Sequence, residues 1–504
     1  MRIRSHSLPF PLLTVVGIVA VIALSSSDAI KAQTAPWTPP YSMLLTPERA
    51  LAFVQAADRR LDYVPGEVLV KFREGVTTAA EERALTALRS RPAVSDLRWI
   101  GDVALLRDPR ELDGTILAAE LSSQPEVAYA QPNYIRHTSL TPNDPGYARA
   151  QWNLTALDMP RAWDINPGAN ENLVVAVVDT GVTTVTQSFS FLTWDGLATR
   201  SIDVPFGINP DLAGSRLVKP RDFVFWTGPV LDMVGHGTHV SSTIGEDANN
   251  GIAEAGIAYR VKLMPLKVCV GFWEVQFVMS ASGFGGFVPL DSGGCPSDAI
   301  GQSVRYAADN GAKVINLSLG GSEPSAVELD AIKYAVGKGA FVSIAAGNGH
   351  DDGNPVVYPA GFAPTIDGVM SVGAVGPSLK RAYYSTTGSQ LEISAPGGSD
   401  RDGGVGGGLI WQATILPADS DAASVIVPRF DRYAEAPAEG TSMAAPHVAG
   451  IAALIMSQGV TSPAAVEALI KKTARDLGTS GRDDEYGYGL IQPRAALFGL
   501  GYGR

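Results

Sequence analysis

Two kinds of hydrophobic pattern follow each other along the chain. Between residues 64 and 134, short strand-like segments alternate with helix-like ones in the order β-α-β-β-α-β. The segments lie at 67–72, 78–88, 97–100, 103–106, 111–121 and 127–134. This order is a split βαβ unit and predicts a small ferredoxin-like α+β domain at residues 64–137. Residues 33–63 are rich in Pro and Ala without a sustained period, which predicts a leader without packed elements.

The second pattern follows a turn-rich stretch at 140–146, which has little to bury and indicates an exposed linker. From residue 138 to residue 504, continuous apolar runs alternate with helical stretches. The apolar runs are 173–178, 262–268, 314–319, 341–346 and 369–374, and the helical stretches include 298–310, 325–337 and 444–457. This alternation predicts a three-layer, doubly wound α/β domain with a mainly parallel sheet. Functional residues of such sheets gather at the carboxyl ends of the strands.

The first residues predict export. Arg2 and Arg4 precede an almost wholly apolar run at 12–24, and Ala32 is a small residue suited to cleavage, so residues 1–32 are interpreted as a signal peptide. A membrane anchor is the competing interpretation, but a spanning helix needs about 20 apolar residues and this run is shorter. We therefore expect a secreted protein, extracellular or periplasmic, without a stable membrane anchor.

Composition narrows the class of protein. Of 504 residues, 45% are hydrophobic and 18% are charged, as in ordinary globular proteins. The formal net charge of -12 argues against nucleic acid as the main partner, because phosphate binding needs clustered Lys and Arg. The two cysteines, Cys269 and Cys295, cannot form a disulfide scaffold and lack the spacing of a structural zinc site. One bridge or two free thiols are both open, and export favours the bridge.

Cleaving a peptide bond with serine needs a nucleophilic hydroxyl, an imidazole to take its proton, a carboxylate to orient the imidazole, and donors for the developing oxyanion. Asp179 follows the apolar run at 174–178, where a buried parallel strand is expected to give way to a loop. Asp179 is therefore a candidate for the carboxylate. An aspartate that caps a helix or closes a turn is the alternative.

Candidates for the imidazole and the hydroxyl lie further along the chain. Gly235 and Gly237 flank His236 and let the backbone approach closely at the start of a helical stretch. A zinc site built from His236 and His239 lacks a carboxylate and a third ligand nearby, so we expect His239 to be structural. Ser442 lies at the start of an apolar helix, where free N–H groups favour a negative charge. A serine at this place is by itself usually an N-cap.

Three segments closely resemble the active-site signatures of the subtilisin family. They are VVAVVDTGV around Asp179, GHGTHVSSTIG around His236 and GTSMAAPHVAG around Ser442, in the chain order that is known for subtilisin. The resemblance covers the chain from about Asp144 to the C-terminus. It implies a subtilisin-like fold and a serine endopeptidase that works through an acyl-enzyme, with Ser442 as nucleophile, His236 as base and then acid, and Asp179 fixing the imidazole tautomer. A catalytically silent binding protein on the same fold is the alternative, because fold alone does not decide function.

The resemblance also covers residues that would bind substrate. Asn348 matches the asparagine that forms the oxyanion hole together with the backbone N–H of Ser442, and a turn asparagine is the alternative. The residues implied to wall the pocket for the residue before the cut are Ser318, Leu319, Gly320, Ala345, Ala346 and Gly347, with Val357 near its base. The match around Tyr358 and Pro359 indicates a cis peptide bond between them.

Two further segments resemble the calcium-binding parts of the family. Residues 248–254 are similar to its tight calcium loop, and residues 209–212 to the segment that contributes a carboxylate. Oxygen ligands from Asp211 and Asn250 suit Ca²⁺, so the resemblance implies a structural calcium ion and no catalytic cofactor. An ordinary Asn-Gly turn is the alternative.

The chain departs from the family pattern in two regions. An aromatic, glycine-rich loop at 270–294, between Cys269 and Cys295, occupies the position that normally lines the cleft for residues upstream of the cut. A bridge would stiffen this loop, and we expect it to favour apolar substrate residues there. A surface insertion without substrate contact is equally consistent. The second region, 400–439, ends in an unexpected Glu439. The sequence assigns no role to this region or to Glu439.

The small domain at 64–137 resembles the inhibitory pro-domains of this family, which assist folding and then leave through self-cleavage. Its last strand and tail, residues 127–140, would lie in the cleft like a product. A permanent N-terminal domain is the alternative, although the exposed linker favours cutting. The expected partners are protein or peptide substrates and the chain's own propeptide, and the expected mature enzyme is a monomer.

Overall fold

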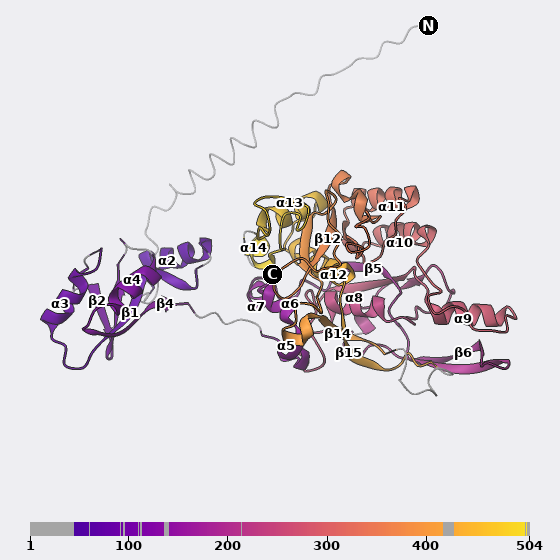
Figure 1. Cartoon of the computed structure of the whole chain (residues 1–504), viewed down its shortest axis with the longest axis horizontal. Coiled ribbons are helices and arrows are strands. Elements are labelled where there is room, and N and C mark those ends of the chain that lie inside the picture. The colour runs from indigo at the N-terminus through magenta and orange to yellow at the C-terminus, as the bar shows by residue number, and fades with distance from the viewer. Residues whose placement is uncertain are drawn as a thin grey trace, which may run out of the picture. The chain divides into compact units, whose positions relative to one another are not determined.

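The structure is a computed structural model that describes residues 45–498 and residue 500, apart from 60, 91, 94, 95, 109, 111, 112, 136–140, 213 and 417–427. The predicted signal peptide lies outside the described residues. The chain divides into two compact units, residues 1–137 and residues 138–504. Figure 1 colours the first unit indigo and the second from magenta to yellow. Within the described residues, no helix is long and apolar enough to span a bilayer.

The N-terminal unit contains a four-stranded antiparallel sheet in the order β2-β3-β1-β4. Its elements are β1 (Tyr63–Phe72), α3 (Thr78–Thr86), β2 (Leu97–Ile100), β3 (Val103–Arg107), α4 (Gly114–Ser122) and β4 (Val127–Tyr134). Val68 and Val70 of β1 point to one face and pack with Leu85 and Leu117 of the two helices, as period-two alternation requires. The chain order and the strand order confirm the predicted ferredoxin-like fold.

A helix that the sequence does not predict precedes this sheet. Helix α2 covers Pro47–Asp58. Its Arg49 forms an ion pair with the buried carboxylate of Glu67 on β1, at 3.3 Å, and Arg107 of β3 donates to the same carboxylate at 3.0 Å. The expectation of an unpacked leader is therefore wrong from residue 47 onward, because α2 gains its stability from contacts with β1 rather than from its own weak periodicity.

The C-terminal unit is built on a seven-stranded sheet in the order β13-β12-β11-β10-β5-β9-β8. Every strand pair in it is parallel. The strands are β5 (Val174–Asp179), β8 (Arg221–Asp222), β9 (Lys262–Lys267), β10 (Val314–Leu317), β11 (Phe341–Ala345), β12 (Val369–Val375) and β13 (Ile393–Pro396). The central strands are buried along their whole length, which is why they appear in the sequence as continuous apolar runs.

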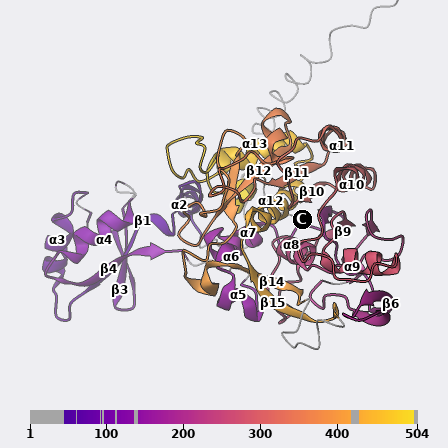
Figure 2. The same cartoon turned by 45° about the vertical axis from the view of Figure 1, so that its right-hand side comes forward.

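Helices cover both faces of this sheet. One face carries α7 (Met159–Ile165), α8 (His236–Gly245), α12 (Thr441–Ser457) and α13 (Pro463–Thr473), and the other carries α10 (Ser297–Asp309) and α11 (Ala326–Gly337). Figures 1 and 2 show α10 and α11 side by side. Further helices are α5 (Pro145–Ala150), α6 (Trp152–Ala156), α14 (Pro493–Phe498), η2 (Gly214–Arg216), η3 (Ala360–Thr365) and η4 (Val405–Gly408). The two hydrophobic cores confirm the predicted three-layer α/β architecture.

Three additions to this sheet form a small aromatic core of their own. They are the hairpin of β6 (Gln187–Trp194) and β7 (Thr199–Phe206), helix α9 (Phe272–Ala281), and the pair β14 (Ile410–Ile415) and β15 (Tyr433–Ala438). The rings of Phe191 and Phe277 stack with their centroids 4.5 Å apart. Region 270–294, interpreted from sequence as a loop, and region 400–439, to which the sequence assigns no role, thus contain regular elements that pack on each other.

Candidate active site

Asp179 and His236 meet where β5 ends. Asp179 is the last residue of β5, and its Oδ1 lies 2.7 Å from Nδ1 of His236, the first residue of α8. The aspartate side chain is 2% exposed and the histidine side chain 33% exposed. Burial disfavours the charged imidazole, but the negative charge of Asp179 and this hydrogen bond outweigh it and raise the pKa of His236. The pair orients the ring and leaves its other nitrogen for proton transfer.

The glycines around His236 are required by close packing. A Cβ atom on Gly237 would lie 2.3 Å from the carbonyl oxygen of Gly181, so only glycine fits there. Gly235 has a φ of 91°, in the left-handed region that glycine adopts without strain. These two residues let the start of α8 approach the end of β5 closely enough for His236 to reach Asp179.

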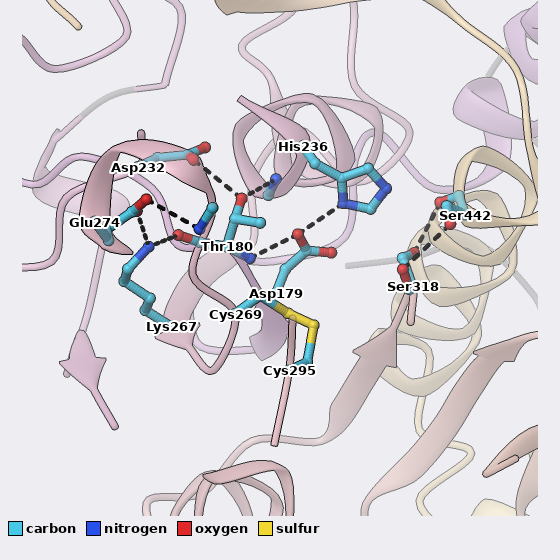
Figure 3. The surroundings of a disulfide bond; sticks show 12 residues. Asp179, Thr180, Asp232, His236, Lys267, Cys269, Glu274, Cys295, Ser318 and Ser442 are labelled. Atoms are coloured by element: carbon cyan, nitrogen blue, oxygen red, sulfur yellow. Dashed lines mark hydrogen bonds and ion pairs between the residues drawn. A yellow bond between two sulfur atoms is a disulfide. The ribbon is translucent and has the colours of Figure 1, made fainter. Parts of the chain in front are cut away.

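A second buried carboxylate, which the sequence analysis missed, organises the same turn. Asp232 Oδ1 accepts hydrogen bonds from the N–H of Gly235 at 2.9 Å and from the Thr180 hydroxyl at 3.0 Å. Its Oδ2 accepts from the N–H of Thr238 at 3.0 Å. Asp232 thus satisfies N–H groups at the start of α8 and links them to the residue after Asp179 (Figure 3). The only sequence signal for it is an aspartate four residues before the candidate histidine.

Ser442 lies in the first turn of α12, next to the loop after β10. Its hydroxyl donates to the carbonyl oxygen of Ser318 at 3.2 Å, and the Ser318 hydroxyl donates to the carbonyl oxygen of Ser442 at 2.8 Å. Figure 3 draws the His236 ring between Asp179 and Ser442. Among the described residues, however, no hydrogen bond joins the Ser442 hydroxyl to His236. The structure therefore brings Asp179 and His236 into contact and pairs Ser442 with Ser318.

Asn348 lies beside Ser442 in the loop after β11. Its Oδ1 accepts hydrogen bonds from the N–H and the hydroxyl of Thr441, both at 2.9 Å. This arrangement holds the amide group and leaves the Nδ2 hydrogens for another acceptor. A Cβ atom on Gly440 would lie 3.3 Å from Nδ2, so a glycine keeps this space open. The amide therefore faces the same region as the nucleophile candidate.

A pocket of about 300 Å³ adjoins Ser442; we call it the Ser442 pocket. Five of the seven predicted wall residues line it: Leu319, Gly320, Ala345, Gly347 and Val357. Ser318 and Ala346 do not line it; Ser318 instead contacts Ser442. Gly321, Ser322 and Pro355, which the sequence analysis did not single out, also line the pocket. The Tyr358–Pro359 bond is cis, as the sequence indicates.

The remaining histidines near the site are buried and turned to other partners. His239 Nε2 lies 3.2 Å from the carbonyl oxygen of Ile410, and burial lowers its pKa to about 4. His447 is held by the carbonyl oxygen of Met443 at 2.8 Å, and burial lowers its pKa to about 4 as well. In the described part of the chain, no group of three or more His, Cys, Asp or Glu side chains is arranged to hold a metal ion.

The predicted calcium segments come together in a cluster of buried acids. Asn250 Nδ2 donates to Oδ1 of Asp211, while Asn250 Oδ1 accepts from the N–H of Ile252 at 2.9 Å. Asp144, which the sequence analysis did not single out, accepts from the N–H groups of Asn249 at 2.8 Å and Asn250 at 3.1 Å. Burial raises the pKa of Asp211 to about 7; the hydrogen bond from Asn250 opposes this, and the nearby charges of Asp247 and Asp144 add to it.

The insertion at 270–294 is attached to the site by a disulfide and by a buried ion pair. Cys269 and Cys295 are joined, with their sulfur atoms 2.03 Å apart. Lys267 Nζ lies 2.9 Å from Glu274 Oε1 of α9 and donates to the carbonyl oxygen of Thr180 at 2.7 Å. Both side chains are at most 1% exposed. Figure 3 shows this pair beside Thr180, so the insertion supplies the counter-ion of a lysine that lies next to the candidate site.

Glu439 has a partner on each oxygen. Its Oε1 accepts from the Tyr383 hydroxyl at 2.7 Å, and its Oε2 accepts from the N–H of Asp400 at 2.9 Å. The glutamate before Gly440 thus ties the segment that leads into α12 to two neighbouring loops. Its unexpected presence in the sequence is explained by these structural bonds.

Comparisons with known proteins show the family of the chain. Residues 170–489 match the Subtilase family, and residues 50–133 match the Fervidolysin N-terminal prodomain. A thermophilic serine proteinase of Bacillus sp. strain AK1 is 30% identical over 426 residues, which cover 84% of this chain and 86% of that protein. An extracellular protease of Xanthomonas campestris pv. campestris is 30% identical over 450 residues, which cover 81% of this chain and 68% of that protein.

A solved structure agrees at the level of fold. The crystal structure of a lanthipeptide protease has a TM-score of 0.51 and 24% identity, and the match covers 72% of this chain and 100% of that chain. The family match extends over more than half of the present chain, from before β5 to beyond α13. The chain therefore belongs to the subtilase family and is a subtilisin-like serine protease.

Proposed function

We propose that this protease is an exported endopeptidase in which Ser442 is the nucleophile, His236 the general base and then the general acid, and Asp179 the residue that fixes the imidazole tautomer. The hydrogen bond between Asp179 and His236 carries the proposal. With Nδ1 bonded to the carboxylate, the ring presents Nε2 as the proton acceptor. The position of Ser442 in the first turn of α12, beside Asn348, also supports these roles.

Formation of the acyl-enzyme at this site requires two proton transfers through His236. The Ser442 hydroxyl turns away from the carbonyl of Ser318 and attacks the scissile carbonyl carbon, while its proton passes to His236 Nε2. The substrate oxygen becomes negative and accepts hydrogen bonds from the N–H of Ser442 and from Nδ2 of Asn348. His236 then donates the proton to the leaving amine, and the acyl-enzyme remains. Water repeats the same steps and releases the acid.

The N-terminal unit is proposed to be an inhibitory propeptide that the enzyme removes itself. Its match to a prodomain family at residues 50–133 and its separate compact core support this role. Cutting near the boundary at residues 137 and 138 would separate the two units. Export through residues 1–32 is consistent with a relative that is named as an extracellular protease.

Intact mass of the purified secreted protein tests the proposal, with and without a serine-directed covalent inhibitor and beside Ser442→Ala. Loss of the residues before about position 138 in wild type only, with one inhibitor adduct on the mature form, is the expected result. Retention of the N-terminal unit in both proteins, without an adduct on wild type, would contradict the proposed nucleophile and self-processing.

Buried oxygens in the acidic cluster around Asp211 support a structural calcium ion. Oδ2 of Asp211 is buried without a hydrogen-bond partner in the structure, as are both carboxylate oxygens of Glu246 and of Glu254. Glu254 also lies 3.6 Å from Arg149. A buried carboxylate without a hydrogen-bond partner is unfavourable in its ionised form unless a cation neutralises it. We propose that Asp211, with Asn250 and Asp144 close by, holds a calcium ion, whose charge would stabilise the loop at 248–254.

Removal of calcium is expected to lower the melting temperature of the mature enzyme. A ligand present at a hundred times its dissociation constant stabilises the folded state by about 2.7 kcal/mol. A chelator removes this stabilisation because it removes the free calcium. Differential scanning calorimetry of the inhibitor-blocked enzyme, with EDTA and with excess calcium, measures the shift. Asp211→Asn should make the melting temperature insensitive to calcium. An unchanged calcium response in this variant would contradict the assigned site.

Replacing Asn348 with alanine is expected to lower kcat by about a hundred- to a thousandfold, the range known for the corresponding change in subtilisin itself. The amide donates to charge that develops in the transition state, so KM should change far less than kcat. Steady-state kinetics on a short peptide measures both constants. An equal effect on kcat and KM, or a change in kcat below about tenfold, would indicate that Asn348 only closes a turn.

The pH dependence of kcat/KM should report the pKa of His236. Only the neutral imidazole accepts the serine proton, so activity rises as the pH passes upward through this pKa, which Asp179 holds above its usual value. Asp179→Asn should move this rise to lower pH, besides lowering kcat about 10⁴-fold. A pH profile of the variant that rises at the same pH as wild type would show that another group controls the rate.

A further inference from the structure

A second cavity adjoins the Ser442 pocket. It has a volume of about 430 Å³, within the range of roughly 300–1,000 Å³ that is typical of ligand pockets. The two cavities share the wall Leu319–Ser322, which is the loop after β10. The second cavity is also lined by Gly294 and Cys295 at the end of the insertion, by Ser297 at the start of α10, and by Glu328 of α11. We call it the Glu328 pocket.

Glu328 is an unusual residue for the wall of a cavity. It is 5% exposed, and glutamate is seldom buried to that extent without a charged partner. Its Oε1 accepts a hydrogen bond from the Ser297 hydroxyl at 2.6 Å. Burial raises the pKa of Glu328, and this hydrogen bond opposes the shift. The carboxylate therefore has a neutral partner, while a cation placed beside it would stabilise its ionised form.

The ordinary structural role of Glu328 does not account for its position. Ser325 and Glu328 have the spacing of a capping box, in which the glutamate side chain bonds back to the N–H of the N-cap residue. The Ser325 hydroxyl does accept from the N–H of Glu328, at 3.4 Å. The Glu328 carboxylate, however, turns to Ser297 on the neighbouring helix and lines the cavity. Half of the capping box is thus replaced by a contact that places negative charge in the pocket.

The described residues that line this pocket include no Lys, Arg or His, so they supply no positive charge to it. A second acid, Glu323, lies in the same wall and is exposed. The pocket therefore combines a buried carboxylate, an exposed carboxylate and the apolar side chains of Ile300 and Leu319. This combination suits the aliphatic stem and charged end of a long basic side chain.

We propose that the Glu328 pocket binds a lysine or arginine side chain of the peptide substrate, so that the enzyme prefers a basic residue near the residue held in the Ser442 pocket. An extended peptide advances about 3.3 Å per residue and points every second side chain to the same face. A strand that follows the shared wall can place one side chain in each pocket. The inference rests on the proposed function, and it differs from the expectation that the insertion favours apolar substrate residues.

Peptide cleavage with matched side chains tests the inference. A fluorogenic peptide series keeps the residue for the Ser442 pocket constant and places lysine, norleucine or glutamate, one at a time, at each neighbouring position. Norleucine matches the stem of lysine without its charge. At one position, we expect kcat/KM to be about tenfold higher or more for lysine than for norleucine, as for hydrogen bonds to buried charged groups. Glutamate should be the poorest residue at that position.

Glu328→Gln keeps the shape of the side chain and an acceptor for Ser297, so we expect it to fold. Its lysine-to-norleucine ratio should fall to about one, and because both peptides are measured on the same preparation, any loss of folded enzyme cancels. Glu323→Gln is the matched control at the exposed acid of the same pocket, and its ratio should fall by about twofold at most, since exposed charges are screened.

The outcomes separate this inference from the proposed function. Cleavage of all peptides without preference for lysine at any position, or a preference for norleucine, would overturn the inference and leave the endopeptidase intact. A lysine preference that survives Glu328→Gln would also overturn it. Absence of cleavage of every peptide, with no inhibitor adduct on Ser442, would overturn the proposed function and the inference with it.

Discussion

Replacing Ser442 with alanine is expected to lower kcat about 10⁶-fold, the magnitude known for the same change in subtilisin itself. The variant keeps the Asp179–His236 hydrogen bond but has no nucleophile from which His236 could take a proton. The remaining activity reflects binding and the oxyanion donors alone. Single-turnover cleavage of an activated ester and of a peptide measures the loss over this range.

A serine in the same helix provides the control. Ser457, the last residue of α12, donates its hydroxyl to the carbonyl oxygen of Leu454 and accepts from Asn166. Ser457→Ala removes these bonds far along the helix from Ser442, so kcat should stay close to wild type. Activity of Ser442→Ala within about a hundredfold of wild type would mean that another residue is the nucleophile, since removal of the true one leaves only the background catalysis.

Replacing Lys267 with methionine is expected to destabilise the C-terminal unit by about 3–5 kcal/mol. The change leaves the carboxylate of Glu274 buried without its cation, and the loss of one partner of a buried pair has this magnitude. It also removes the donor that holds the carbonyl oxygen of Thr180, next to Asp179. We therefore expect kcat to fall more than KM rises. Urea unfolding in the Ser442→Ala background, which avoids self-digestion, measures the stability.

Two further variants test whether the loss of stability comes from breaking the buried pair. Lys267→Met with Glu274→Leu removes both charges and should recover most of the lost stability, because apolar side chains of similar size often replace buried pairs. Lys338 and Asp309 form an exposed pair at 3.4 Å, so Lys338→Met should change stability little. A small effect of Lys267→Met, similar to that of Lys338→Met, would contradict the role of the buried pair.

The Lys267–Glu274 pair affects any test of whether the insertion contacts substrate. Deleting residues 270–294 removes Glu274 and leaves Lys267 buried without its carboxylate. Such a variant would lose stability for a reason unrelated to substrate preference. Deletion combined with Lys267→Met removes this defect, so the peptide preference of the combined variant is measured without an unpaired buried lysine.

Much of the architecture follows from local pattern. The buried parallel strands are continuous apolar runs, and their ends place Asp179 and Asn348 at the edge of the sheet where sites form. The alternation along β1 likewise predicts the N-terminal sheet. Short-range pattern does not predict α2, α9 or the β6–β7 hairpin, because each is stabilised by contacts with residues distant in the sequence.

The sequence by itself determined the order of elements and which residue types carry the chemistry, since periodicity and the three signature segments are local properties. Only the tertiary structure decided which charged residues became buried. Three acids look like ordinary surface residues along the chain: Asp232 near His236, Glu274 beside Lys267, and Glu328 in its pocket. Their roles arise because packing removes them from water, after which each requires a partner that the folded structure or a substrate supplies.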